Sequence, residues 1–432
     1  MENETEKMRF APVKGMKDFM PEEAETFQRM IDVVRRIFEK YGFQPLITPA
    51  LESFELLSVK GGLGEGVKDE IYYFRDKGER EVGLRFDLTM PLARIISSNL
   101  NLPMPFKRYA IDRAWRYDNP QALRYREFWQ ADIDIIGSKE ITADIECLCA
   151  AVEILETLGV ENFKIYVSNR KLIQGILEKL GLRDDEVTRA LRIIDKVKKI
   201  GIEETRKQLE EIKKFDVETL IKLLEMKGSV YEKIDKIEKL FPDVDGLEDL
   251  KKFFLLALDF GILDYLNFDL SIVRGLDYYT GLVFEILLPE SNVSFGGGGR
   301  YDNLIKTISG VDYPAVGISL GLTRLFQFLV DRGLIKTSPP AKIFVAAVSD
   351  GLRSTAMKIV RQLRAAGVRT EWDISGRKLS KQLEYASALR IPYVAIIGEN
   401  EIKLSSIKVR NMTSGEEIMM PMGSFIAWAR EI

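Results

Sequence analysis

The chain has 432 residues and a formal net charge of −3; 46% of its residues are apolar, 30% are charged and none is histidine. This composition is typical of globular proteins, and the length predicts two or three domains. Without histidine, a Ser-His-Asp triad, an imidazole metal ligand and an imidazole general base are all excluded.

The acidic start, Met-Glu-Asn-Glu-Thr-Glu, differs from a signal peptide, and no apolar run is long enough to span a bilayer. We therefore expect a cytosolic protein without a membrane partner. Residues 341–432 carry 14 Lys and Arg against 9 Asp and Glu, a net of +5, which leaves −8 for the rest. A basic C-terminal module on an acidic body is compatible with RNA binding. Cys147 and Cys149 are interpreted as small core residues.

A helix is predicted from Pro21, where proline and the following acids suit a first turn, to Gly42, which suits a helix end. One apolar stripe runs along it: Phe27, Met30, Ile31, Val34, Phe38 and Tyr41. The stripe fits either a dimer interface or the core of its own domain. The proline-rich segment Phe43–Pro49 is expected to be extended, at a sheet edge.

Short strands are predicted at Glu81–Asp87, Tyr109–Arg116 and Arg126–Ile136, and a helix at Met90–Ser97. Tyr117–Arg124 forms a polar turn between the last two strands. Short strands separated by helices and long connections indicate a mixed α/β body built on a largely antiparallel sheet.

From about residue 169 to 260 the chain becomes rich in Lys and Glu with widely spaced apolar residues. This texture predicts a helical insertion whose charge runs are solvated helix faces, with RNA contact as an open alternative. Thr337–Ala341 is typical of a linker. The remaining chain predicts a βαβαβ unit with a parallel core. Its elements are expected at Ile343–Val348, Leu352–Ala366, Val368–Asp373, Leu379–Leu389 and Tyr393–Gly398.

The stretch Val273-Arg-Gly-Leu-Asp-Tyr-Tyr-Thr-Gly281 lies between two runs that are interpreted as strands, Phe268–Val273 and Leu282–Leu288. With the polar cluster Gly296–Asp302, it indicates a pocket for a small planar polar group beside a phosphate. A plain hairpin with edge tyrosines is the alternative.

Phosphate handling is expected from arginine side chains, because planar and permanently charged guanidinium groups suit phosphates and no Walker A sequence is present. The candidates lie near predicted strand ends: Arg116, Arg124, Arg274, Arg300 and Arg324. The Gly-rich run Gly61–Gly66 follows no clear strand and is discounted. The match of Gly317–Gly321 to a nucleophile elbow is attributed to chance, since no histidine could activate the serine.

These residues resemble those of class II aminoacyl-tRNA synthetases, and the chain is similar to the histidyl-tRNA synthetase family over essentially its full length. The resemblance rests on residues 20–50, Ala114–Gln130, Ala315–Arg324 and two family signatures, Arg274-Gly-Leu-Asp-Tyr-Tyr279 and Gly299-Arg-Tyr-Asp302. It implies an α+β class II catalytic domain over residues 1–335, on an antiparallel sheet with the helical insertion. A linker at 336–341 and a C-terminal α/β anticodon-binding domain at 342–432 would follow.

The resemblance also implies a histidine–tRNA ligase. Such an enzyme joins histidine and ATP to histidyl-adenylate and pyrophosphate, then transfers histidine to tRNA(His), as a homodimer with Mg²⁺ bridging the outer ATP phosphates. Two alternatives remain open. One is a non-catalytic paralogue, the regulatory subunit of ATP phosphoribosyltransferase, and the other is a synthetase-like RNA-binding module.

By resemblance, Arg116 and Arg274 are the catalytic residues. Arg116 would hold the α-phosphate and the amino acid carboxylate, and Arg274 would stabilise the charge that develops on that phosphate. Three other side chains complete the ATP site, one by stacking on adenine and two by charge: Phe128, Arg124 and Arg324. Asn119 stands where some relatives have a basic residue that contacts tRNA.

The histidine site implied by the resemblance has two parts. The substrate ammonium is assigned to Asp87, Thr89 and Gln130, and the side-chain end of the pocket to Asp134, Tyr278, Tyr279 and Tyr301. A neutral imidazole has one N–H, which a carboxylate can accept, and one bare nitrogen, to which a tyrosine hydroxyl can donate. Asp87 and Asp134 are shorter than the glutamates of many relatives.

Overall fold

The computed structural model describes residues 11–59, 67–119, 123–273, 278–288, 294–335 and 339–432. They form two compact units, one from residues 11–18 and 29–335 and the other from residues 19–28 and 339–432. Within the described ranges, no helix combines the length and the apolar character that crossing a membrane requires.

The first helix, α1 (Pro21–Lys40), begins at the predicted proline, and Gly42 follows it with the left-handed φ of +76° that suits a glycine after a helix. Met30, Ile31, Val34 and Phe38 are all buried. The apolar stripe therefore belongs to the core of the chain itself, which is one of the two alternatives that its pattern left open.

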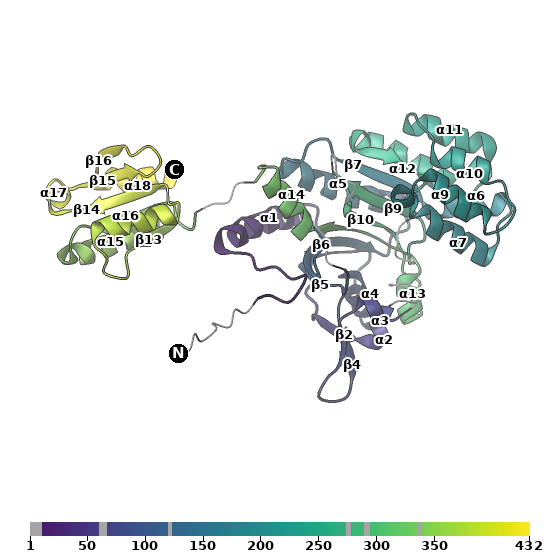
Figure 1. The fold of residues 1–432 in the computed structure, drawn as a ribbon, viewed down its shortest axis with the longest axis horizontal. Helices are drawn as coiled ribbons and strands as arrows, with labels where there is room; N and C mark the ends of the chain where they lie inside the picture. Colours follow the sequence, from purple (N-terminus) through teal and green to yellow (C-terminus); the bar gives the residue numbers. More distant parts are fainter. Residues whose placement is uncertain (1–10, 60–66, 120–122, 274–277, 289–293, 336–338) are drawn as a thin grey trace, which may run out of the picture. The chain divides into compact units, whose positions relative to one another are not determined.

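The larger unit is built on an eight-stranded sheet in the order β1-β5-β6-β11-β10-β9-β7-β8 (Figure 1). The strands are β1 (Gln44–Pro45), β5 (Phe106–Trp115), β6 (Glu127–Ile136), β11 (Ala315–Gly321), β10 (Ser294–Arg300), β9 (Leu282–Leu287), β7 (Lys164–Asn169) and β8 (Leu266–Phe268). Only the outermost pairs, β1 with β5 and β7 with β8, are parallel among these strands. The predicted class II sheet, largely antiparallel, is confirmed.

The two faces of the interior strand β6 differ in polarity. Ile133 is buried on one face, where its register partner Tyr109 contacts Phe38 of α1 with ring centroids 5.7 Å apart. Asp132 and Asp134 alternate with it and lie on the other face. There Ile136 joins an apolar cluster with Met90 and Ile96 of α4 (Thr89–Ser98). Polar and apolar surfaces are thus separated by the pleat of one strand.

Two predicted strands are wrong at their C-terminal ends. The strand expected over Glu81–Asp87 is β4 (Glu81–Leu84), which pairs in a small sheet with β2 (Leu51–Ser53) and β3 (Tyr73–Arg75). Asp87 therefore lies beyond the strand, just before α4. The strand expected over Phe268–Val273 ends at Phe268.

The second error has a local cause. The carboxylate of Asp269 accepts hydrogen bonds from the backbone N and the Oγ of Ser271, at 2.9 and 2.6 Å. Such a bond to the chain two residues ahead forms a turn and competes with the sheet ladder. Arg274, on which the phosphate prediction depends, lies outside the described residues.

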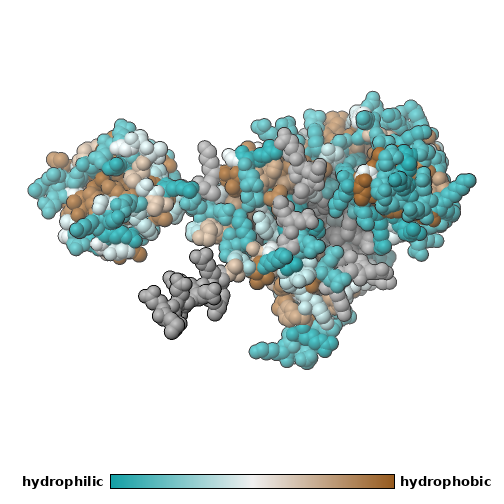
Figure 2. Space-filling model, viewed as in Figure 1, coloured by the Kyte–Doolittle hydropathy of each residue, from teal (hydrophilic) through white to brown (hydrophobic). Residues whose placement is uncertain are grey.

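The predicted helical insertion is present, since every regular element between Arg170 and Asp259 is a helix. Its helices are α6 (Arg170–Lys179), α7 (Asp184–Ile194), α8 (Val197–Ile200), α9 (Ile202–Glu210), α10 (Val217–Leu224), α11 (Val230–Leu240) and α12 (Leu247–Asp259). Figure 2 shows mostly hydrophilic residues on the visible face of this region, as expected of solvated helix faces.

The smaller unit contains the predicted βαβαβ arrangement. Its sheet has the order β13-β12-β14-β15-β16, with the first three strands parallel and the last two antiparallel. The elements are β12 (Ile343–Ala347), α15 (Arg353–Ala365), β13 (Thr370–Trp372), α16 (Leu379–Ala388), β14 (Tyr393–Ile397), α17 (Glu399–Lys403), β15 (Ser406–Asn411), β16 (Glu417–Pro421) and α18 (Met422–Glu431).

Candidate active site

A polar row on β6 forms the floor of the candidate site. Gln130, Asp132 and Asp134 are spaced by two residues and therefore share one face of the sheet. All three are buried. Glycine and serine flank the row on β11, where Gly317 is opposite Asp134 and Ser319 is opposite Asp132.

Gly317 makes room for the buried carboxylate beside it. A Cβ atom at this position would lie 2.1 Å from Oδ1 of Asp134 and 2.7 Å from the carbonyl oxygen of Ile133. Such distances are far below van der Waals contact, so any side chain here would displace Asp134. The Gly-x-Ser-x-Gly match is thus a strand segment that borders the acids, and Ser319 accepts a hydrogen bond from Gln130 at 2.8 Å.

Asp134 is held from two sides. Nη2 of Arg108, which is fully buried on β5, lies 2.6 Å from Oδ2 of Asp134 and also donates to the carbonyl oxygen of Leu88 at 3.0 Å. The hydroxyl of Tyr301 donates to Oδ1 of Asp134. Burial raises the pKa of Asp134, and the Arg108 charge and the Tyr301 hydrogen bond act in the opposite direction. Burial also raises the pKa of Tyr301 well above its usual value, so its hydroxyl keeps its proton.

Besides Oδ2 of Asp134, whose contact with Arg108 is an ion pair, three buried oxygens of the site have no hydrogen-bond partner among the described residues: Oδ2 of Asp87, Oε1 of Gln130 and Oδ1 of Asp132. The other oxygen of Asp87 accepts from the backbone N of Thr89 and of Met90, at 3.2 and 2.9 Å, at the start of α4. Buried acceptors are normally satisfied, so an orphaned set indicates a ligand that donates hydrogen bonds. An ammonium group has three such donors.

Asp132 and Arg108 were missed by the sequence analysis. Burial raises the pKa of Asp132 to about 7, and the negative charges of Asp134 and Asp87 add to this effect against the Arg108 charge and the Ser319 hydrogen bond. The spacing from Gln130 to Asp134 already placed Asp132 on the same face. Arg108 could not be found this way, because its place opposite Asp134 depends on the register of β5 with β6.

The predicted tyrosines are brought together. The ring of Tyr278 lies 4.8 Å from that of Tyr279 and 5.7 Å from that of Tyr301. Tyr278 and Tyr301 are buried, and Tyr279 is half-buried. Gly299 permits this arrangement, because a Cβ atom there would lie 3.0 Å from Cδ1 of Tyr279 and 2.5 Å from the carbonyl oxygen of Leu282.

Arg116 and Phe128 lie beside this floor. Nε of Arg116 donates to the carbonyl oxygen of Phe86 at 3.0 Å, and its guanidinium carbon is 5.3 Å from the centre of the Phe128 ring. Phe128 shares the polar face of β6 because it is two residues before Gln130. An aromatic face next to a guanidinium suits a base with an attached phosphate.

Arg324 and Arg124 both lie at the polar turn after β5. Nε of Arg324, on α14 (Leu322–Asp331), donates to the carbonyl oxygen of Leu123 at 2.9 Å, and its Nη1 donates to that of Ser294. Nε of Arg124 is 2.9 Å from Oδ2 of Asp118. Both guanidinium groups therefore border the same polar turn.

The expectation that Arg300 handles phosphate is wrong. Its guanidinium is buried, donates to the carbonyl oxygens of Ser138 and Glu140 at 2.8 and 3.0 Å, and pairs with Asp144 of α5 (Ile141–Thr157). Burial raises the pKa of Asp144 to about 6, and the Arg300 charge opposes this effect. The alternation of β10 explains the error, since Arg300 faces away from the side of its neighbour Gly299.

The cysteines are on α5, where Cys147 is buried and Cys149 is half-buried, and neither forms a disulfide. Burial raises the pKa of both thiols, that of Cys149 to about 11. Thiols with raised pKa values are poor nucleophiles at neutral pH. Their interpretation as core residues is therefore confirmed for Cys147 and holds in part for Cys149.

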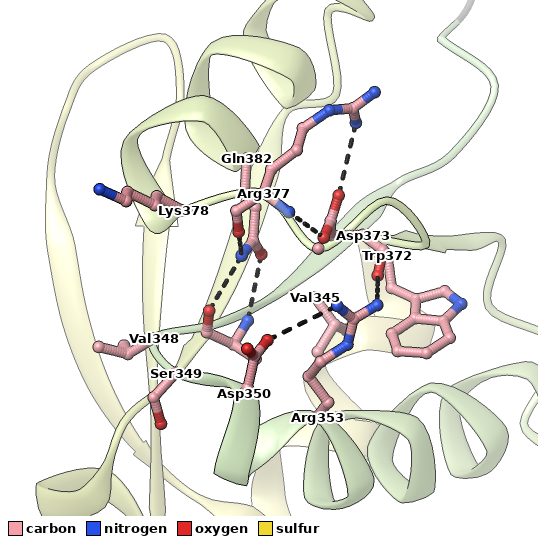
Figure 3. A pocket seen from close by; sticks show the side chains of 12 residues that line it. Val345, Val348, Ser349, Asp350, Arg353, Trp372, Asp373, Arg377, Lys378 and Gln382 are labelled. Atoms are coloured by element: carbon pink, nitrogen blue, oxygen red, sulfur yellow. Dashed lines mark hydrogen bonds and ion pairs between the residues drawn. The ribbon is translucent and has the colours of Figure 1, made fainter.

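The smaller unit has a cavity of its own, of about 310 Å³, at the carboxyl ends of β12 and β13 (Figure 3). Nη2 of Arg353 donates to the carbonyl oxygen of Asp373 at 3.2 Å, and Nη1 of Arg377 lies 3.5 Å from its carboxylate. The indole of Trp372 lies beside Arg353, and Lys378 extends away from this cluster. Crevices at this edge of parallel strands are common ligand sites.

Stability should fall with rising pH because of Asp132. Its folded-state pKa of about 7 lies above the usual aspartate pKa of 3.8, so the unfolded chain loses this proton first. Stability is therefore lost between about pH 4 and pH 7 and then stays level. Asp132→Asn removes this dependence. The free energy of unfolding of the variant, relative to that of the wild type, should therefore rise by about 3 kcal/mol from pH 5 to pH 8.

Chemical denaturation of both proteins at the two pH values measures the difference. Asp259→Asn, an exposed substitution at the end of α12, is the control and should show no such gain. A difference between Asp132→Asn and wild type that is equal at pH 5 and pH 8 would contradict the assigned pKa.

Comparisons with known proteins agree with this geometry. A family model of histidyl-tRNA synthetase matches residues 15–325, and one of the anticodon binding domain matches residues 342–432. The histidine–tRNA ligase of Pyrococcus abyssi is 36% identical over 431 residues, which cover 97% of this chain and 98% of the relative. Histidine–tRNA ligase 1 of Bacillus cereus is also 36% identical, over 428 residues that cover 96% and 99%.

Solved structures give the same answer. The crystal structure of histidyl-tRNA synthetase from Nostoc sp. PCC 7120 has a TM-score of 0.88 at 31% identity and covers 98% of this chain and 100% of its own. An ATP phosphoribosyltransferase regulatory subunit/histidyl-tRNA synthetase from Bacillus halodurans has a TM-score of 0.76, but at 22% identity it shows a shared fold alone, over 88% of this chain and 97% of its own. By sequence and structure, the chain belongs to the histidyl-tRNA synthetase family.

Proposed function

We propose that this chain activates histidine with ATP and transfers it to tRNA(His), with the β6 floor as the histidine site. The observation that carries this assignment is the buried carboxylate of Asp134, held between Arg108 and Tyr301 next to three unsatisfied acceptors. A pocket of this kind is built to receive a ligand with several N–H groups.

Asp134 accepts the N–H of a neutral imidazole, and a tyrosine hydroxyl donates to the bare ring nitrogen. Tyr279 is the candidate for that donor, because the hydroxyl of Tyr301 donates to Asp134, and Tyr278 packs against both rings. Apolar isosteres of histidine would leave the buried polar groups unpaired, so the site should reject them without an editing step. Asp134 has a shorter side chain than the glutamate of many relatives. Because Gly317 has no side chain, the Asp134 carboxylate can lie against β11.

The ammonium of histidine binds the three orphaned acceptors, Asp87, Gln130 and Asp132. Thr89 contributes through its backbone N, which orients Asp87. Binding a cation favours the ionised form of Asp132. The substrate ammonium therefore supplies a positive charge that pairs with these carboxylates.

ATP lies toward Arg116, with adenine stacked on Phe128 and Arg324 on its other face. Arg116 holds the α-phosphate and the substrate carboxylate, and Arg124 faces the outer phosphates. Mg²⁺ is held mainly by phosphates and water in such sites. Among the described residues, no group of three or more acidic or cysteine side chains is arranged to hold a metal ion. We place Mg²⁺ on the outer phosphates, where it neutralises charge when bound.

Arg274→Ala should slow adenylate formation by about a hundredfold, since one preorganised donor at a developing oxyanion is worth about 3 kcal/mol. ATP binding should weaken far less, because Arg116 and Arg324 remain. Arg274→Lys should recover only part of the rate, since an ammonium lacks the bidentate fork. Rapid-quench measurement of histidyl-adenylate is the assay, and a near-normal rate for the alanine variant would show that Arg274 has no part in the chemistry.

The C-terminal domain, over residues 342–432, binds the anticodon region of the tRNA, and residues 1–335 form the catalytic domain. The cavity beside Arg353, Trp372 and Arg377 supports this role, because cations next to an aromatic ring suit a nucleotide. Residues 336–341 act as the linker.

Lys378→Ala should weaken tRNA charging and lower the slope of log affinity against log salt by about one. Pyrophosphate exchange, which needs no tRNA, should stay at the wild-type rate. Lys403→Ala, an exposed lysine of the same domain, is the matched control. Equal loss of exchange and charging in Lys378→Ala would refute the separate role of this domain.

We further propose a cytoplasmic homodimer joined at the β1 edge of the large sheet. The apolar stripe of α1 no longer supports this, because it is buried within the chain. The remaining support is Ile47, which is 88% exposed just after the short edge strand β1. Light scattering at micromolar concentration should give twice the mass of one chain, and a monomer would refute the assembly.

A further inference from the structure

The helical insertion contacts the catalytic sheet through a buried lysine. Lys233 of α11 is 8% exposed, and its Nζ donates to the carbonyl oxygen of Phe268 at 2.8 Å and to Oδ1 of Asn267 at 3.2 Å. Burial lowers its pKa, and the negative charge of Asp269 opposes this effect. A buried ammonium is unfavourable unless specific partners hold it. Its partners here are two neighbouring residues at the end of β8.

A second helix of the insertion, α8, contacts Asp269, the residue that follows β8. Nζ of Lys198 on α8 lies 3.0 Å from Oδ2 of Asp269 and 4.7 Å from the centre of the Tyr166 ring on β7. The backbone N of Asp269 donates to the carbonyl oxygen of Val167 at 3.0 Å, and its carboxylate holds Ser271. Two lysines from the insertion thus converge on residues 267–271.

Packing and polar contacts both hold this segment, since Leu270, Ile272 and Val273 are buried. A cavity of about 140 Å³ lies between the insertion and the sheet, and its lining includes Lys233, Asp269 and Leu270. The polar contacts of the two lysines therefore add to packing in fixing the position of the chain after β8.

We propose that the insertion, through Lys233, positions the segment that leads into Arg274 and so sets the rate of histidyl-adenylate formation. Val273 is buried at the end of this segment, and Arg274 follows it directly in the sequence. Lys233 is a positioning residue, since it acts through the backbone of Phe268 and touches no reacting atom. The inference rests on the proposed role of Arg274.

The test compares Lys233→Met, which keeps the length and removes the charge, with Lys233→Arg, which keeps the charge. Lys236→Met, an exposed lysine on the same helix, is the matched control. A small displacement of a catalytic group can slow a reaction by about 10- to 100-fold. We expect a loss of this size in adenylate formation for Lys233→Met, with the KM values of ATP and histidine nearly unchanged. Lys233→Arg should recover part of the rate, and Lys236→Met should match the wild type.

A double-mutant cycle separates positioning from general stability. If Lys233 acts through Arg274, Lys233→Met should slow adenylate formation by less than about threefold in the Arg274→Ala background. Losses that multiply in the double variant, or a wild-type rate for Lys233→Met, would overturn the inference. If Lys233→Met does not fold, Asn267→Ala removes one contact of the same ammonium and takes its place, with the same cycle.

The failure of the proposed function has a different signature. A wild-type protein that forms no histidyl-adenylate would refute the assigned activity itself. An active wild type with an unaffected Lys233→Met would refute only the positioning role.

Discussion

The buried ion pair between Arg108 and Asp134 joins the neighbouring strands β5 and β6 at the point where the candidate site lies. Asp87, Asp132 and Asp134 gather there away from water, and burial raises the pKa of each. Without a positive charge among them, such carboxylates would take up protons, and the neutral acids could no longer bind a cationic ligand. Arg108 opposes this effect for all three. Breaking a buried pair leaves an uncompensated charge and typically costs about 3 to 5 kcal/mol.

The glycines of β10 and β11 are the second constraint, and they follow from the first. A Cβ atom at Gly317 would strike the carboxylate of Asp134, and one at Gly298 would lie 2.0 Å from the carbonyl oxygen of Gly317. The absence of side chains at these positions of β10 and β11 thus allows the carboxylate of Asp134 to lie flat against the sheet. The glycine run of β10, which the sequence showed as part of a polar cluster, therefore serves close strand packing next to the site.

Much of the site followed from spacing along single strands, and little followed from contacts between strands. Gln130 and Asp134 could be placed together because β6 is one continuous strand. Arg108 depended on a register that the residues of β5 do not reveal. The prediction that Arg300 handles phosphate failed for a related reason. The face of β10 on which Arg300 lies was known only once the structure had placed Gly299. After β8, the apolar pattern of Leu270, Ile272 and Val273 imitated a strand, and the side chain of Asp269 turned the chain instead. Local hydrogen bonds of this kind override periodicity.

The central claim is that both ring nitrogens of histidine are recognised, one by Asp134 and the other by a tyrosine hydroxyl. Histidine-dependent pyrophosphate exchange, measured with histidine and with its Nδ1-methyl and Nε2-methyl forms, tests this most directly. A site that pairs both nitrogens should use histidine and discriminate against each methylated form by about 10⁴ in kcat/KM, because one buried partner would be left unpaired. Exchange with either methylated form within tenfold of histidine would contradict the account, as would the absence of exchange with histidine itself.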